Sequence, residues 1–231
     1  MELHLENITK DPYILPEGSD FETFYTYAKE FTLKNYKNVW DRYLAINRDT
    51  TSPQDWFQEL IWVIHASGFS AKAVGKFITK ITDAYGDFKS CARMNEEDLL
   101  SAASPICNNP PKLLAVQKGS RIILEGFESG DWISWKKDNF KSAEDFSKFP
   151  FVGKVTCYHM ARNLGYLESV KPDLHLNRIA NYYNFPSAFD MCASIQDDAP
   201  LGLRDLALWY YCSTFGTKHL MGIDEDTSTN R

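Results

Sequence analysis

Apolar side chains recur at intervals of three and four residues along most of this chain, a spacing that places them on one face of an α-helix. Between residues 20 and 47 these positions are Phe21, Phe24, Tyr25, Ala28, Phe31, Tyr36, Val39, Trp40, Tyr43 and Leu44. The alternation that indicates a β-strand is nearly absent, and only the ILEGF segment at 123–127 is ambiguous. The pattern therefore predicts an all-α fold.

Capping residues and prolines mark where several of these helices begin. Ser52-Pro53-Gln54-Asp55 combines a capping serine, a proline in the first turn and an acid three residues after the serine. Asn95 precedes a second apolar run, and Pro110-Pro111 opens a third. Further helices are expected at about 155–164, 174–184, 186–195 and 201–215.

Composition places the chain among folded globular proteins, with 44% hydrophobic and 14% aromatic residues in 231. No stretch approaches the roughly 18 apolar residues of a membrane span, and the first ten residues do not resemble a signal peptide. We therefore expect an intracellular protein of the cytoplasm, nucleoid or nucleus that has no membrane partner and acts as a monomer. The five cysteines form no C-x-x-C pair, so neither disulfides nor a metal site are expected.

The segment 149–180, FPFVGKVTCYHMARNLGYLESVKPDLHLNRIA, combines features that an ordinary loop does not require. Pro150 interrupts a helix, and Gly153 permits either a positive φ or the close approach of another group. Apolar residues resume at helical spacing from Val155. The segment thus predicts a helix, a hairpin and a second helix whose first N–H groups point outward, which is a site for an anion such as phosphate. An ordinary turn between helices fits the same spacing.

This segment resembles the helix-hairpin-helix and Gly/Pro/Asp signature of the base-excision DNA glycosylase superfamily, which includes endonuclease III. The family hairpin L-P-G-V-G-x-x-T-A corresponds to FPFVGKVTC at 149–157, and V/K-P/V-D-x-H-x-x-R corresponds to KPDLHLNR at 171–178. Upstream, ELIWVIHASGFSAKAVGKFITKI resembles the first core helix of the superfamily and the turn after it. The resemblance spans about Trp56 to Ala180.

The resemblance implies a two-lobed helical bundle with a helix-hairpin-helix motif, in which 1–231 forms one bilobal unit. A central lobe would comprise 56–166, with the hairpin at 149–157. The second lobe would combine 1–55 with 167–222, and 223–231 would be a tail.

The resemblance also implies a partner and a reaction: double-stranded DNA carrying a modified base, which is flipped out and released by hydrolysis. Asp173 would be the catalytic residue, since a carboxylate stabilises the positive charge that develops on the sugar and can activate a water. His175 and Arg178 would support Asp173. Asp173 can also simply cap the helix that follows Pro172, and that interpretation stays open.

Family roles for other residues follow from their positions. Backbone contacts to DNA are expected from Val152, Gly153, Lys154, Val155 and Thr156, and a monovalent cation at this hairpin is the one cofactor considered. The candidates for a strand-inserting wedge or a base pocket are Phe69, Trp62, Trp132 and Trp135, although packing in the core is an alternative for each.

The net charge of -6 argues mildly against a nucleic-acid partner, but the acidic excess lies outside the central region. A modest phosphate-binding face could come from nine basic residues there: Lys112, Lys118, Arg121, Lys136, Lys137, Lys141, Lys148, Lys154 and Arg162.

Three departures from the family pattern matter. Phe151 replaces the first glycine of the hairpin. Val155 stands where bifunctional members carry a lysine nucleophile, which predicts a monofunctional enzyme because Lys154 lies about 100° round the helix. The cysteines of the family's iron–sulfur site are missing, since only Cys192 and Cys212 follow Asp173.

Three alternatives stay open: a catalytically inactive helix-hairpin-helix DNA-binding protein, a bifunctional glycosylase/lyase with a relocated lysine, and a helical protein-interaction module. The excised base is open as well.

Overall fold

The computed structural model describes residues 13–216, apart from positions 14, 17 and 70. Regular secondary structure in this part of the chain is helical throughout, with 14 helices and no strand. The prediction of an all-α fold is therefore confirmed, and the ambiguous ILEGF segment lies inside a long helix. The tail expected at 223–231 lies outside the described residues.

The described residues divide into two compact units. Residues 46–166 form the first unit, and residues 13–45 together with 167–216 form the second. Sequence analysis had assigned residues 46–55 to the second lobe, whereas the structure places them in the first unit. The reason is a set of hydrogen bonds: Lys136 Nζ donates to the carbonyl of Arg48 at 2.7 Å and to that of Thr51 at 2.9 Å.

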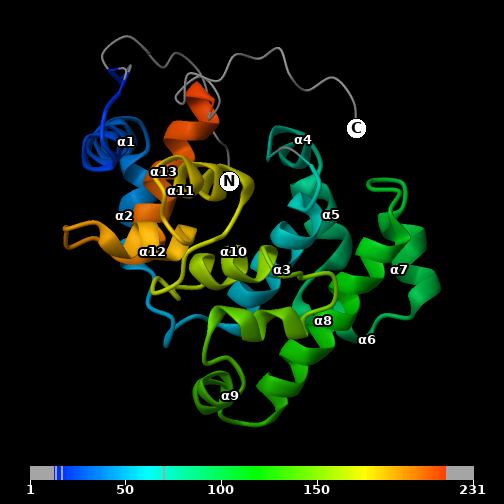
Figure 1. Ribbon diagram of the computed structural model, residues 1–231. Helices are drawn as coiled ribbons and strands as arrows, with labels where there is room; N and C mark the ends of the chain where they lie inside the picture. The colour runs from blue at the N-terminus through cyan, green and yellow to red at the C-terminus, as the bar shows by residue number, and fades with distance from the viewer. Residues whose placement is uncertain (1–12, 14, 17, 70, 217–231) are drawn as a thin grey trace. The chain divides into compact units, whose positions relative to one another are not determined.

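The first unit is built around α3 (Pro53–Ala66), whose capping box joins Ser52 and Asp55 as the sequence indicated. The other helices are α4 (Ala71–Gly75), α5 (Ile78–Tyr85), α6 (Phe88–Arg93), α7 (Glu96–Ala103), α8 (Pro110–Glu128), α9 (Trp132–Asn139), the 3-10 helix η2 (Ala143–Lys148) and α10 (Thr156–Asn163). Figure 1 shows α8 with α6 and α7 alongside it. Helix α8 also packs on α3, where Gly119 allows a close approach because a Cβ there would lie 2.5 Å from Leu60 Cδ2.

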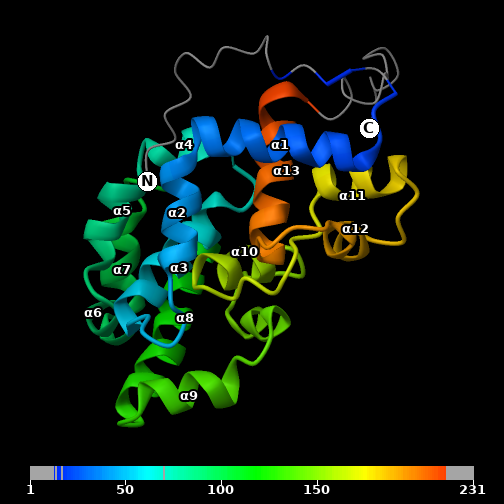
Figure 2. The same cartoon turned by 90° about the vertical axis from the view of Figure 1, so that its left-hand side faces the viewer.

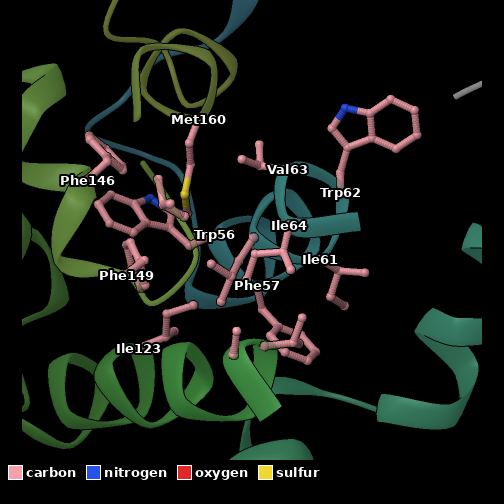
Figure 3. Close-up of a cluster of buried hydrophobic side chains, with 14 of the residues drawn as sticks. Trp56, Phe57, Ile61, Trp62, Val63, Ile64, Ile123, Phe146, Phe149 and Met160 are labelled. Carbon is pink, nitrogen blue, oxygen red and sulfur yellow. The ribbon is translucent and has the colours of Figure 1, made fainter. Parts of the chain in front are cut away.

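Aromatic side chains fill the core on one side of α3. The Trp56 indole packs against the rings of Phe146 and Phe149, with centroid distances of 5.1 and 6.2 Å (Figure 3). The centroid of the Phe140 ring lies 4.8 Å from that of Trp56. Phe149 is the first residue of the predicted hairpin. This packing anchors one end of the hairpin to the central helix.

The second unit combines helices from two distant parts of the chain. These are α1 (Phe21–Asn35), α2 (Lys37–Ala45), α11 (Leu174–Tyr182), α12 (Ala188–Ser194) and α13 (Leu201–Phe215). Figure 2 shows α1 lying across α13. The rings of Phe24 and Phe31 on α1 meet the Tyr211 ring of α13 edge to face, at 5.4 and 5.8 Å. Among the described residues, no helix is long and apolar enough to cross a membrane.

Candidate functional site

The predicted hairpin, residues 149–157, forms a tight turn between η2 and α10. Phe149 and Val152 point into the unit, and the N–H of Val152 donates to the carbonyl of Phe149 at 3.1 Å. Because its side chain is buried, Val152 can reach DNA only through its backbone. The helix before the turn is a 3-10 helix of six residues, so the helix-hairpin-helix motif stays a prediction.

Within this hairpin the unusual backbone conformation falls on the residue that replaces the first glycine of the family pattern. Phe151 has a φ of 68°, in the left-handed region that favours glycine, and its side chain is 47% exposed. Gly153 does not have a positive φ, and a Cβ there would meet only Thr156 Oγ1 at 3.9 Å. The fold therefore does not require glycine at position 153, which leaves the approach of an outside group as the reason that sequence analysis offered.

The start of α10 leaves several backbone N–H groups without an acceptor among the described residues. The N–H of Gly153 donates to Thr156 Oγ1 at 2.7 Å, and the N–H of Cys157 donates to the carbonyl of Gly153 at 2.9 Å. The N–H groups of Lys154, Val155 and Thr156 have no acceptor within the described part of the chain. An anion at this position would satisfy N–H groups that the helix leaves open.

The wedge candidate Phe69 lies near this hairpin through a shared neighbour, Lys112. The Lys112 side chain comes from the first turn of α8, and its Nζ donates to the carbonyl of His65 at 3.2 Å and to that of Ser67 at 2.6 Å. The same Nζ lies 4.6 Å from the centroid of the Phe69 ring and 6.0 Å from that of Phe151. Sequence analysis did not anticipate this grouping.

Burial shifts the pKa of two groups at this end of the unit, His65 and Lys112. The His65 imidazole is fully buried, and its Nε2 lies 2.9 Å from the Tyr85 hydroxyl oxygen. Burial lowers the pKa of His65 to about 4, with a further contribution from the charge of Lys112. Burial also lowers the pKa of Lys112. The neutral His65 is therefore a packing residue at neutral pH.

The three tryptophans considered for a base pocket take part in packing. Trp62 is buried on α3, on the side away from Trp56 (Figure 3). Trp132 and Trp135 stack on each other at 5.3 Å, and the indole N–H of Trp132 donates to the carbonyl of Thr51 at 2.8 Å. The packing position of these three residues agrees with the alternative that the sequence left open.

Trp135 is also distant from the Phe69 side of the unit. Its ring packs against Gly126 near the end of α8, whereas Lys112 lies in the first turn of the same helix. At a rise of 1.5 Å per residue, these two positions are about 21 Å apart along the helix axis. The structure therefore does not bring Trp132 and Trp135 together with Phe69.

Several of the nine basic residues do not form an exposed face. Lys112, Lys136 and Arg162 are buried, and the two lysines donate to backbone carbonyls. Lys137 and Lys148 are ion-paired, with distances of 3.5 Å to Asp49 and 3.0 Å to Asp145. Arg121 is exposed, but its Nε donates to the carbonyl of Ala92 at 3.2 Å. The side chains left for phosphates are Lys118, Lys141 and Lys154, all of which are exposed. The expected basic face is thus smaller than the count of residues suggested.

A separate candidate site is the turn at Asp173, in the second unit. Asp173 Oδ1 caps α11, accepting from the N–H groups of His175 at 3.0 Å and Leu176 at 3.1 Å. Asp173 Oδ2 lies 3.4 Å from Lys171 Nζ, and the Asp173 side chain is only 12% exposed. Capping is therefore one role of Asp173, and it uses a single carboxylate oxygen.

Residues around Asp173 hold this turn in place. The N–H of Lys171 donates to Asp205 Oδ2 at 2.6 Å, and Asp205 is fully buried on α13. The side-chain amide of Asn177 donates to the carbonyl of Pro172 at 3.1 Å. His175 and Arg178 follow on α11, both partly exposed, and their supporting role stays a prediction.

No group of three or more potential metal ligands occurs among the residues that the structure describes. The monovalent cation considered at the hairpin stays a prediction. No family model, curated protein or solved structure matches the chain. The resemblance to DNA glycosylases therefore rests on the motif residues alone.

Proposed function

We propose that this protein is a monofunctional DNA glycosylase that flips a modified base out of duplex DNA and hydrolyses its N-glycosidic bond. The observation that carries the proposal is that the two oxygens of the Asp173 carboxylate have different partners. Oδ1 accepts both capping hydrogen bonds, so Oδ2 does not take part in the cap. Asp173 can thus fix the start of α11 and still offer an oxygen to a water or to the sugar.

The hairpin supplies support for the DNA-binding part of the proposal. Three backbone N–H groups at the start of α10 lack acceptors among the described residues, and Lys154 beside them is exposed. Gly153 leaves open space above the backbone, which a phosphate could occupy. Such contacts position a protein on DNA without reading its sequence.

Val155 supports hydrolysis without strand scission. It is exposed at the position where bifunctional relatives carry an amine nucleophile, and its aliphatic side chain cannot form a Schiff base. The proposed product is an intact abasic site. We propose further that the enzyme acts as a monomer inside the cell, where its DNA substrate is found.

A substitution at Asp173 tests the reaction. Duplexes that each contain one modified base are first screened for base release, and Asp173→Asn is then compared with the parent protein in single turnovers. We expect at least a hundredfold loss of rate, with DNA affinity changed less than fivefold, because asparagine caps a helix as well as aspartate does but carries no charge.

Asp20→Asn is the matched control, because Asp20 caps α1 in the same unit through its side chain and has no proposed catalytic role. Near-normal turnover by Asp173→Asn would show that Asp173 is only a helix cap. Salt-dependent DNA binding without base release from any duplex would favour the inactive DNA-binding alternative.

One observation favours the bifunctional alternative. Lys171 Nζ lies 3.4 Å from Asp173 Oδ2, so an amine is present beside the proposed catalytic carboxylate. An ion-paired ammonium is not a nucleophile, and we therefore expect borohydride to trap no protein–DNA adduct during turnover. An adduct that disappears in Lys171→Ala would identify a relocated lysine and overturn the monofunctional proposal.

A further inference from the structure

We propose that Phe151 and Phe69, here called the aromatic pair, form a site that stacks on unpaired nucleobases at a bulge or gap in DNA. The inference deepens the proposed function, since it rests on DNA binding by the first unit. It does not depend on catalysis by Asp173.

The first step concerns the backbone of Phe151. A phenylalanine at a φ of 68° is uncommon, because a side chain in this conformation is crowded by its own backbone. Such strain is typical of residues whose side chain is used for something other than packing. The Phe151 ring does not fill the core, since it is 47% exposed. The hairpin therefore holds this ring at the surface.

The second step concerns the partner ring. Phe69 follows the end of α3 and is 51% exposed, so it too contributes little to the core. Both ring centroids lie within about 6 Å of the same ammonium, that of Lys112. Lys112 is 4% exposed and held by two carbonyls, so the charge beneath the rings has a fixed position. Two rings from separate loops thus lie over the same ammonium group, whose position is fixed.

The third step identifies the ligand from the surrounding charge. The aromatic pair adjoins the open N–H groups at 154–156 and the exposed Lys154, three residues after Phe151. A ligand that matches this surface presents flat apolar faces together with negative charges. Nucleotides meet both requirements, because bases stack on aromatic rings while phosphates bind N–H groups and lysine.

The fourth step explains the preference for unpaired bases. In an intact duplex both faces of each base are covered by neighbouring bases, so a ring stacks only after a step has been opened. A bulge or gap exposes base faces in advance and removes this cost. Stacking accepts any base, so the preference is for DNA structure and is independent of sequence.

The test measures binding to unmodified DNA, so that no base release takes part. Fluorescence anisotropy compares an intact duplex with the same duplex carrying a two-nucleotide bulge or gap. We expect the parent protein to bind the interrupted DNA at least tenfold more tightly. Phe151→Ala and Phe69→Ala should each remove at least fivefold of this preference while changing affinity for the intact duplex less than twofold.

Three further variants control for loss of an exposed ring and for loss of side-chain volume. Phe127→Ala is the matched control, because Phe127 is 42% exposed in the same unit and has Lys89 Nζ 4.1 Å from its ring centroid. This variant should keep the full preference. Phe151→Tyr should also keep it, whereas Phe151→Leu should lose it, since leucine is apolar but cannot stack.

A fluorescent base analogue in the bulge gives a second readout, because stacking on a ring quenches its emission. The parent protein should quench it and Phe151→Ala should not. An unchanged preference in Phe151→Ala, with the fold verified by circular dichroism, would overturn the inference. Loss of the preference in Phe127→Ala would overturn it too.

The result is separable from the proposed function. Base release without any preference for interrupted DNA would overturn the stacking site alone. The preference without base release would support the site and count against the glycosylase. Binding to a protein partner that Phe151→Ala abolishes, with no preference for interrupted DNA, would reassign the aromatic pair to protein recognition.

Discussion

The first unit buries two lysines among aromatic rings, and the two places use those rings differently. Lys136 Nζ donates to the carbonyls of Arg48 and Thr51 beneath a Trp132 ring whose centroid is 5.5 Å away. Lys112 Nζ likewise donates to two carbonyls, at the end of α3. Near Lys136 the tryptophan rings are packed on each other and on the core.

Near Lys112 the aromatic pair is about half exposed. A buried lysine therefore serves the same structural purpose in both places, since its ammonium donates to backbone carbonyls of a segment distant in the sequence and holds that segment in place. The difference lies in the rings: covered rings stabilise the unit, and exposed rings are available to a ligand. The exposure of the rings thus distinguishes those that support the fold from those that are candidates for binding a ligand.

The largest expected effect is a difference between the covered and the exposed rings in their contribution to the free energy of unfolding. Trp132→Ala should lower the free energy of unfolding by about 3–4 kcal/mol, because it removes a packed indole and its hydrogen bond to Thr51. Phe69→Ala should change it by less than about 0.5 kcal/mol, since that ring is half exposed. Urea titrations followed by circular dichroism measure both values. Equal losses would show that the two rings do not differ in this way.

A smaller effect on the free energy of unfolding should appear at acid pH, through His65 next to Lys112. The folded protein binds a proton at His65 only near pH 4, whereas the unfolded chain binds it near pH 6.5. The contribution of neutral His65 to the free energy of unfolding is therefore fully present above pH 6.5. It is lost as the pH falls toward 4, and it amounts to about 3 kcal/mol at most. His65→Gln should flatten the dependence of the unfolding free energy on pH over this range. An unchanged slope in the variant would assign the acid sensitivity to other groups.

The smallest effect concerns the two hairpin positions. At Phe151, with its positive φ, Phe151→Gly should be more stable than Phe151→Ala by about 1 kcal/mol, because only glycine adopts this conformation freely. Gly153→Ala should be neutral or stabilising by up to about 0.5 kcal/mol, since its backbone is ordinary and the space is open. Thermal unfolding of the three variants measures these differences in stability. Destabilisation by Gly153→Ala would mean that the fold itself needs glycine there.

Local features of the chain could be predicted from the sequence. The helix expected at 201–215 is α13, and the one expected at about 155–164 is α10 at Thr156–Asn163. The Ser52 cap and the capping role of Asp173 could also be predicted from the sequence, because a cap depends on residues within one turn.

The features that the sequence did not reveal depend on distant contacts. Lys136 bonds carbonyls some 85 residues away, and Lys112 bonds carbonyls about 46 residues away, so neither lysine differs locally from an exposed one. The grouping of Phe69 with Phe151 has the same origin. The positive φ at Phe151 had one signal in the sequence, the replacement of the hairpin's first glycine by phenylalanine, and this signal pointed to the residue that has the positive φ.

The discontinuous second unit has a consequence for the order in which the chain folds during synthesis. Helix α1 packs on α13, and Thr32 Oγ1 donates to the carbonyl of Ala207, 175 residues later. At roughly 5–20 residues per second, a ribosome needs on the order of 10–30 s to make the chain between them. Residues 46–166 are complete within that interval and can fold as a continuous piece. The apolar face of α1 that contains Phe24 and Phe31 is therefore without its α13 partner throughout this interval.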